Sequence, residues 1–282
     1  QDAYSIYPIP RNAQYADGSF TLGTEITVVS EEGIDAYTNQ FLDEILTDYG
    51  RTKTVSETIP EGTNQILLGI KGSGGAVDAW AESNLTLSDA ELFTKTDAYL
   101  IHADGGRIVI LGKDTNAVYY GLATLQMMFS SFNGTKFLNV QIEDYAGMKM
   151  RGFIEGFYGG WTHDGRKSLM QFARDVKMNT YIYASKTDSY HKNDELYPAD
   201  QINQIKELVA VGDQTKVKYC WSIHLSYFFN SLPSNIESEE YQTQFNQKFD
   251  RLKAKFQQLY DAGVRKFAVL NDDFGSGSHT EV

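Results

Sequence analysis

The sequence predicts an α/β protein with a small α+β N-terminal domain followed by the first half of a (β/α)8 barrel. Three observations support this prediction. Strand-like runs and a hairpin signal share the first half of the chain with two helical patterns. The second half alternates strictly between strand and helix patterns, and a polar or glycine-containing segment follows each of its strands. We place the two domains at residues 1–147 and 148–282.

The N-terminal domain combines strands and helices in one α+β layer arrangement. Asp104-Gly105-Gly106 stands between two apolar β-branched runs, which is typical of a tight hairpin turn. His102 lies in one of these runs, and we interpret it as a strand residue whose polar groups are satisfied rather than as a ligand. No residues in this half converge on a reaction, so we expect a structural or positioning role. The expected strands are 25–30, 66–70, 99–102, 107–111 and 137–142, and the expected helices are 33–48 and 115–129.

The second half predicts parallel strands joined by right-handed helical crossovers. Gly263 ends the last helix as a C-cap glycine. A doubly wound sheet also gathers ligands at strand ends, but the clustering of polar residues there favours a barrel. About four β/α units are visible where a complete barrel needs eight. The expected strands are 148–158, 179–184, 217–223 and 264–270, and the expected helices are 163–178, 199–216 and 239–261.

Composition limits the function classes. The chain has 37 acidic and 25 basic residues, a net charge of −12, and no block of Lys or Arg, which excludes a nucleic-acid binder. No apolar run approaches the roughly 20 residues that span a bilayer, and the start of the chain has no signal-peptide pattern. The single cysteine, Cys220, excludes an internal disulfide and a cysteine-based zinc site. We expect it to be a buried strand residue.

The adjacent carboxylates Asp272 and Asp273 are the strongest candidates for catalysis. They follow the apolar run 267–270 and precede a Gly/Ser-rich turn, the position in which a barrel strand delivers acid and base groups. Two close carboxylates cannot both ionise freely, so one can donate a proton while the other stays charged, as glycoside cleavage requires. Two alternatives remain open: a solvated Asp-Asp pair, or a magnesium site that adds Asp188, although no spaced ligand set supports a metal.

Four sequence blocks resemble the start of the catalytic domain of glycoside hydrolase family 84, whose members are bacterial β-N-acetylglucosaminidases, often called hyaluronidases, and O-GlcNAcases. The blocks cover most of residues 148–275, and residues 1–147 resemble the small domain that precedes the barrel in bacterial members. A family 20 hexosaminidase would use the same acetamido chemistry but pairs Asp with Glu. The four blocks are residues 151–159, 179–183, 186–191 and the run 263–268 that leads into the Asp pair.

The resemblance implies a retaining mechanism in which the 2-acetamido oxygen of the substrate forms an oxazoline. Asp272 would orient and polarise the acetamido N–H, and Asp273 would act as general acid and then general base. Gly156, through its carbonyl, and Lys186 match positions that bind sugar hydroxyls, and Tyr158 matches one near the acetamido pocket. The alternatives without a role in substrate binding are a tight turn at Gly156 and a solvated cation at Lys186.

The resemblance also implies which partners and cofactors to expect. We expect no cofactor, no metal and no membrane span. The expected partner is a glycan or glycoprotein bearing N-acetylglucosamine. We expect a bacterial enzyme that is secreted or bound to the cell surface and whose signal peptide has already been removed. The competing hypothesis is a truncated, non-catalytic carbohydrate-binding or structural fragment. Because an open half-barrel exposes strand edges, we also expect the isolated chain to self-associate.

Overall fold

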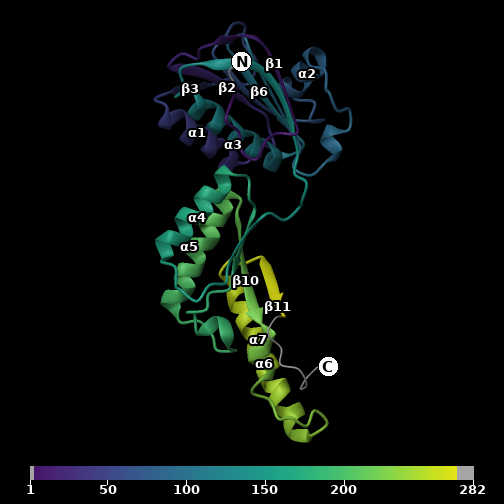
Figure 1. The fold of residues 1–282 in the computed structure, drawn as a ribbon, viewed down its shortest axis with the longest axis vertical. Helices are drawn as coiled ribbons and strands as arrows, with labels where there is room; N and C mark the ends of the chain where they lie inside the picture. Colours follow the sequence, from purple (N-terminus) through teal and green to yellow (C-terminus); the bar gives the residue numbers. More distant parts are fainter. Residues whose placement is uncertain (1–2, 272–282) are drawn as a thin grey trace. The chain divides into compact units, whose positions relative to one another are not determined.

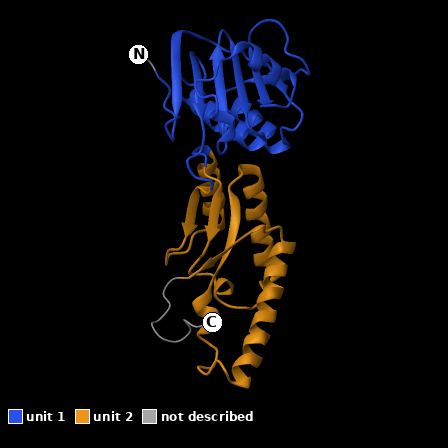
Figure 2. Cartoon of the chain, turned by 90° about the vertical axis from the view of Figure 1, so that its right-hand side faces the viewer, with its two compact units in different colours: residues 1–149, 175–177 blue, residues 150–174, 178–282 orange. Residues whose placement is uncertain are grey.

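The computed structural model describes residues 3–271 and divides into two compact units. The N-terminal unit comprises residues 1–149 and 175–177, and the C-terminal unit comprises residues 150–174 and 178–282 (Figure 2). The first unit holds a mixed sheet with helices, and the second holds a sheet of parallel strands alternating with helices. The predicted α/β fold class is therefore confirmed.

The N-terminal unit is built on a seven-stranded sheet in the order β1-β7-β5-β6-β4-β2-β3 (Figure 1). Strands β3, β2, β4 and β6 run parallel to one another, whereas β5 pairs antiparallel with both β6 and β7, and β1 pairs antiparallel with β7. The strands are β1 (Asn12–Phe20), β2 (Glu25–Ser30), β3 (Thr52–Val55), β4 (Gln65–Ile70), β5 (Tyr99–Asp104), β6 (Arg107–Gly112) and β7 (Phe137–Asp144).

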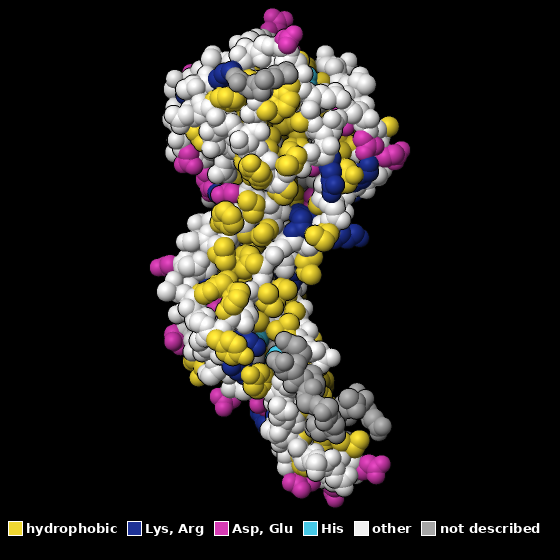
Figure 3. Space-filling view, viewed as in Figure 1, with side chains coloured by type: hydrophobic (Ala, Val, Ile, Leu, Met, Phe, Trp, Pro, Cys, Tyr) yellow, Lys and Arg dark blue, Asp and Glu magenta, His cyan; other side chains and the backbone are white. Residues whose placement is uncertain are grey.

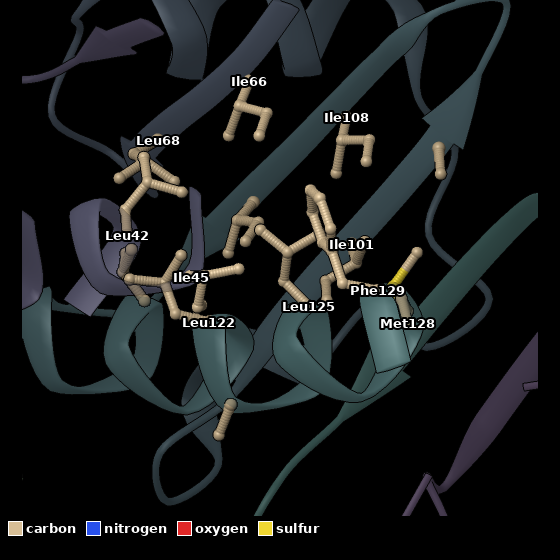
Figure 4. Close-up of a cluster of buried hydrophobic side chains, with 14 of the residues drawn as sticks. Leu42, Ile45, Ile66, Leu68, Ile101, Ile108, Leu122, Leu125, Met128 and Phe129 are labelled. Atoms are coloured by element: carbon tan, nitrogen blue, oxygen red, sulfur yellow. The ribbon is translucent and has the colours of Figure 1, made fainter. Parts of the chain in front are cut away.

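Two helices, α1 (Ala36–Asp48) and α3 (Thr115–Ser131), cover one face of this sheet and enclose the main core. Figure 4 shows their aliphatic side chains, Leu42 and Leu122 among them, pointing toward Ile66 of the sheet. The other face carries α2 (Ala76–Asn84) over a smaller cluster around Val77, and a 3₁₀ turn, η1, spans Leu92–Thr94. Each sheet face is thus closed by a helix, which leaves this unit with its own cores.

The hairpin prediction is confirmed in detail. Asp104 pairs with Arg107, and Gly105 and Gly106 both have positive φ, at 55° and 87°. Successive positive φ values define the tight turn that matches strand twist, and glycine adopts them without strain. The prediction missed β1, β3 and α2. The two strands lie at the sheet edges and are almost wholly exposed, so their sequences carry no alternating apolar pattern.

The N-cap residue of α2 is Gly75, which has no side chain to cap the helix. The missing acceptor comes from Glu31 in the distant turn after β2. One carboxylate oxygen accepts from the amides of Val77 and Asp78, both at 2.8 Å. The other accepts from the Ile70 amide at 2.9 Å and the Ser73 hydroxyl at 2.7 Å. Since Glu31 is buried, this carboxylate serves as an external N-cap that ties β2, β4 and α2 together.

Replacing Glu31 with alanine should therefore destabilise the N-terminal unit. The substitution leaves buried helix amides without an acceptor, for an expected loss of about 2–4 kcal/mol in the free energy of unfolding. Urea denaturation followed by circular dichroism measures it. The neighbouring Glu32 is exposed, so Glu32→Ala is the matched control and should change the stability by less than about 0.5 kcal/mol. Equal losses in the two variants would refute the capping role.

The C-terminal unit contains a four-stranded parallel sheet in the order β11-β10-β9-β8 (Figure 1). Helices α4 (His163–Asp175), α5 (Ala199–Thr215) and α7 (Glu239–Asp261) supply the crossovers. Short segments η2 (Tyr190–Lys192) and α6 (Leu225–Phe229) follow β9 and β10. Because the strands are parallel and adjacent in sequence order, their carboxyl ends lie at one edge of the sheet. The strands are β8 (Gly152–Glu155), β9 (Thr180–Tyr183), β10 (Lys218–His224) and β11 (Lys266–Leu270).

One face of this sheet packs against the helices. Alternate residues of β9 and β10 contribute aromatic rings that pack with Met170 of α4, Leu208 of α5 and Leu259 of α7. Hydrophobic side chains also lie on the surface of this unit that Figure 3 shows. Val269 of β11 is 58% exposed. The rings at the centre of the core belong to Tyr181, Tyr183, Tyr219 and Trp221.

Helix α7 has the expected termini. Ser238 caps its start by accepting from the Tyr241 amide at 3.0 Å. At the end, Gly263 adopts φ of 100° and donates to the Tyr260 carbonyl, while Val264 donates to Leu259. This double hydrogen bond is a Schellman motif, which confirms the C-cap predicted for Gly263.

The first strand of the second half is shorter than predicted. Only Gly152–Glu155 pairs as β8, whereas the expected strand ran from 148 to 158. Residues 157–160 after it form an exposed loop that pairs with no strand. Cys220 is buried in β10 as expected. In the part of the chain that the structure describes, no helix has the length and apolar character to cross a membrane.

Candidate active site

The predicted catalytic pair, Asp272 and Asp273, lies outside the described residues. Strand β11, which precedes this pair in the sequence, ends at Leu270 beside His224 of β10, at the carboxyl edge of the parallel sheet. The roles given to these two carboxylates stay predictions.

Gly156, Tyr158 and Lys186 follow the carboxyl ends of the neighbouring strands β8 and β9. A Cβ atom added to Gly156 would meet no heavy atom within 4 Å, and its φ is not in the left-handed region. Neither packing against the described residues nor backbone strain therefore demands a glycine there. Tyr158 is 89% exposed, and Lys186 is half-buried. The structure brings these three residues to one edge of the sheet, and their sugar-binding roles stay predictions.

Glu155 is the last residue of β8, and it is fully buried. Its two oxygens accept from Arg166 of α4, at 2.9 Å from Nε and 2.8 Å from Nη2, and it also accepts from the Tyr181 hydroxyl. Although burial opposes its charge, the hydrogen bond and charge of Glu155 help to raise the pKa of Arg166 above its usual range. This bidentate pair locks α4 to β8, which gives Glu155 a structural role.

The loop after β9 is organised by the carboxylate of Asp188. Its Oδ2 accepts from the hydroxyls of Tyr183 at 2.7 Å and Tyr197 at 2.8 Å. Its Oδ1 accepts from the amides of Tyr190 at 2.8 Å and His191 at 3.2 Å. Burial, followed by the negative charge of Asp188, raises the pKa of both tyrosines. Four donors thus fix the loop that begins at the strand end and carries Lys186.

These contacts bear on the magnesium alternative. Both oxygens of Asp188 already accept two hydrogen bonds each, so the carboxylate would have to give up donors to bind a cation. Among residues 3–271, no three His, Cys, Asp or Glu side chains come together in a group that could hold a metal ion.

Lys255 supports the same loop from helix α7. Its side chain is fully buried, and its ammonium donates to the carbonyl of Tyr190, to the carbonyl of Asn193 at 2.7 Å and to the Asn193 side chain at 3.3 Å. The ammonium also lies 5.0 Å from the Tyr197 ring centre and 5.8 Å from that of Trp221. Burial lowers the pKa of Lys255 to about 8 even though Asp188 opposes the shift. A buried lysine with three oxygen acceptors is a positioning group for this loop.

No sequence signal indicates the role of Lys255, because lysine in a helical pattern normally predicts an exposed position. Glu155 and Arg166 were missed for a related reason: they are 11 residues apart, in a strand and the following helix. Buried charge pairs of this kind are recognised only when the register of both elements is known. An Asp followed closely by aromatic residues could have suggested the Asp188 cluster.

Replacing Lys255 with methionine should loosen the loop. Methionine fills similar space but leaves two buried carbonyls without donors, so amide hydrogens of residues 186–194 should exchange at least about tenfold faster. Hydrogen exchange with mass spectrometry measures the change. Lys253 lies on the same helix with an exposed side chain, and Lys253→Met is the matched control. Unchanged exchange in the loop of the Lys255→Met variant would contradict the positioning role.

His191 gives this loop a pH dependence. It is 2% exposed and packs edge-on against Tyr183 and Trp221. Burial lowers the pKa of His191 to about 4 from 6.5, opposed by Asp188 and assisted by the charges of Lys192 and Lys186. The unfolded chain therefore binds more protons at this residue between pH 4 and 6.5. The contribution of His191 to the free energy of unfolding must rise with pH across that window.

The expected slope is about 1.4 kcal/mol per pH unit between pH 6.5 and 4. A His191→Phe variant keeps an aromatic ring but cannot titrate, so its stability should depend less on pH by that amount. Urea denaturation at half-unit steps compares the two proteins, with His163→Phe as a control at a partly exposed histidine. Parallel pH profiles for the wild type and His191→Phe would exclude a neutral buried His191.

The fold defines a class of protein: a mixed-sheet domain followed by a unit of parallel strands and helices of the kind that begins a (β/α)8 barrel. Residues 3–145 match the family described as glycosyl hydrolase family 20, domain 2, and residues 151–281 match the family described as beta-N-acetylglucosaminidase. The chain belongs to the former domain family, and its second half is similar to the glycoside hydrolase family 84 type.

Solved structures support this assignment. The structure of CpGH84D is 41% identical with a TM-score of 0.83, covering 95% of this chain and 44% of that one. The structure of CpGH84B is 28% identical with a TM-score of 0.76, covering 96% of this chain and 45% of that one. The exo β-N-acetylglucosaminidase of Vibrio harveyi shares the fold, with a TM-score of 0.62 at 13% identity.

Curated relatives include the protein O-GlcNAcase of Rattus norvegicus and that of Mus musculus. Each is 29% identical over 127 residues, which make up 43% of this chain and 12% of the relative. The chain thus spans less than half the length of the solved relatives and about an eighth of the curated ones.

Proposed function

We propose that this polypeptide belongs to an enzyme that removes terminal β-linked N-acetylglucosamine from glycans or glycoproteins with retention of configuration. The observation that carries the proposal is the match of residues 151–281 to the beta-N-acetylglucosaminidase family, a range that includes Gly156, Lys186, Asp272 and Asp273. The parallel strands support it, because Gly156 and Lys186 follow the carboxyl ends of β8 and β9, which lie at one edge of the sheet.

In the proposed mechanism the acetamido oxygen of the substrate attacks the anomeric carbon and the glycosidic oxygen leaves. Asp273 donates its proton to that oxygen, and later takes a proton from the water that opens the oxazoline. Asp272 stays ionised and accepts from the acetamido N–H, which stabilises the positive charge that develops there. Lys186 donates to a sugar hydroxyl, and the Gly156 carbonyl accepts from another. The absence of any packing need for glycine at position 156 supports a close approach of substrate to the backbone.

Turnover of aryl β-N-acetylglucosaminides tests the roles of the two carboxylates. Asp273→Ala should lower kcat/KM by about 10²–10⁴ for a 4-nitrophenyl glycoside, and by much less for a 2,4-dinitrophenyl glycoside, whose leaving group needs no proton. Asp272→Asn should lower both rates alike, because it acts on the acetamido group. Asp250 of α7 has an exposed side chain, so Asp250→Ala is the control with unchanged rates.

Two results would contradict the proposal. Equal losses for both leaving groups in Asp273→Ala would remove the acid role from Asp273. Sugar binding without turnover by the wild-type chain would favour the carbohydrate-binding alternative, and loss of that binding in Lys186→Ala would locate it at the same sheet edge.

A further inference from the structure

A small cavity of about 190 Å³ lies in the C-terminal unit, at the carboxyl end of β10. It is bounded by the loop after β9, the short helix α6 and helix α7. Ile223, Phe228 and Leu252 line it, and all three are buried members of the core of this unit. Ser231 also lines it and is exposed to solvent. The cavity therefore has an apolar inner wall and an opening to the surface.

Two lysines, Lys192 of η2 and Lys248 of α7, bring ammonium groups to this cavity. The ammonium of Lys248 donates to the hydroxyl of Ser231 and lies 5.4 Å from the ring centre of Phe228. The ammonium of Lys192 lies 5.5 Å from the ring centre of Tyr227. The hydroxyl-bearing serine and both rings belong to residues that line the cavity. The charged ends of the two lysines, and not only their hydrocarbon stems, therefore lie beside it.

Both ammonium groups keep donors to spare. An ammonium has three N–H donors, but within residues 3–271 Lys192 donates to one acceptor, the Lys186 carbonyl at 2.8 Å, and Lys248 to one, the Ser231 hydroxyl. Neither lysine forms an ion pair with a carboxylate in the described part of the chain. Burial lowers the pKa of Lys248 even though the charge of Asp194 opposes the shift. An anion in the cavity would supply the acceptor and the opposite charge that these groups lack.

The charge balance at the cavity favours an anion with a single charge. Among the described residues that line it, only Asp194 is acidic, and its carboxylate already accepts from Arg251 at 2.7 Å. The two lysines are left with a local excess of positive charge, although the chain as a whole has a net charge of −12. A carboxylate can be shared between two ammonium groups, whereas the second charge of a phosphate or sulfate would add to the repulsion from Asp194.

The apolar wall defines the rest of the ligand. Ile223, Phe228 and Leu252 offer no hydrogen-bonding side chain, so hydrocarbon is favoured over water against them. The cavity is smaller than the roughly 300–1,000 Å³ of sites for drug-sized ligands, so it suits a body of a few carbon atoms.

We propose that this cavity binds a short-chain monocarboxylate, whose carboxylate accepts hydrogen bonds from Lys192 and Lys248 and whose alkyl chain packs against the apolar wall. The proposal goes beyond the proposed catalytic function and does not depend on it, because it requires neither a glycoside nor turnover. Since Lys192 also donates to the Lys186 carbonyl, a bound carboxylate would restrain the loop after β9.

The test is calorimetric titration of the full chain with three small molecules at low ionic strength. Butyrate should bind with a Kd on the order of 1 mM. Butyramide has nearly the same shape without the charge and should bind at least about tenfold more weakly. Acetate keeps the charge but lacks most of the alkyl chain, and it should bind at least about fivefold more weakly than butyrate. Added sodium chloride should weaken the binding of butyrate.

Substitution of the lysines locates the site. Lys192→Met and Lys248→Met should each weaken the binding of butyrate at least about fivefold, because each removes one cation and keeps a side chain of similar length. Lys253 provides a matched control: it also lies on α7, and its ammonium is 5.2 Å from the ring centre of Phe249, but it does not line this cavity. Lys253→Met should leave the affinity for butyrate unchanged.

The opposite results would overturn the proposal. Equal affinities for butyrate and butyramide, or no saturable binding of butyrate up to about 100 mM, would exclude an anion site in the cavity. Equal affinities for acetate and butyrate would refute the contact with the apolar wall. Binding that survives Lys192→Met and Lys248→Met would place the anion elsewhere, and its loss in Lys186→Ala alone would place it at the candidate active site.

Circular dichroism checks that each variant is folded. Should one not fold, hydrogen exchange of the unsubstituted chain decides the case. Butyrate should slow amide exchange in residues 190–194 and 226–231, which border the cavity, and butyramide should not. Equal exchange in these segments with and without butyrate would refute the site.

Discussion

The C-terminal unit depends on one constraint: the carboxylate of Asp188 must be surrounded by donors. Two tyrosine hydroxyls reach it from β9 and from the segment before α5, and two amides reach it from its own loop. Trp221 of β10 donates to one of those tyrosine hydroxyls at 3.0 Å, so the network extends to the next strand. Removing the charge would leave donors from several elements unmatched. The conformation of the loop that carries Lys186 is thus an electrostatic consequence of Asp188.

The other buried charges of this unit act in the same region. Glu155 and Arg166 hold the first helix against the first strand, and Lys255 holds the last helix against the loop of Asp188. Each charge is satisfied by several hydrogen bonds, because the desolvation penalty of a buried charge must be offset by such contacts. Rigid support beneath a strand-end loop is what a binding or catalytic edge needs, since a loop alone cannot hold side chains within the tolerance of the chemistry.

The sequence predicted those parts of the fold whose signal is local. The hairpin at Gly105-Gly106, the cap at Gly263 and the strand–helix alternation of the second half depend on neighbouring residues, and they are confirmed. Strands β1 and β3 were missed because edge strands need no apolar alternation. The Glu31 cap was missed because its acceptors and donors are about 40 residues apart, and nothing in a local pattern links them.

In the candidate site, too, residues with a local sequence signal could be predicted, whereas residues whose role depends on burial could not. Gly156 and Lys186 could be selected from motifs that surround them, and the parallel register brings both to one sheet edge. The supporting residues could not be selected, since their importance comes from burial. Lysine at position 255 and histidine at position 191 would each pass for an ordinary surface residue by sequence, yet both are almost fully buried beside Asp188.

Asp188 also lines a cavity of about 340 Å³ together with residues of α4 and α5, among them Arg166 and Gln204. Any ligand that draws a tyrosine donor away from Asp188 in the cavity must change the energy of the loop that carries Lys186. By linkage, a ligand held by Lys186 must then change affinity in the cavity by the same factor. The size of that coupling is limited by the hydrogen bonds that Asp188 exchanges, about 1 kcal/mol for each. A rigid network at Asp188 therefore implies weak coupling, and a coupling of several kcal/mol would require the network to have a second arrangement.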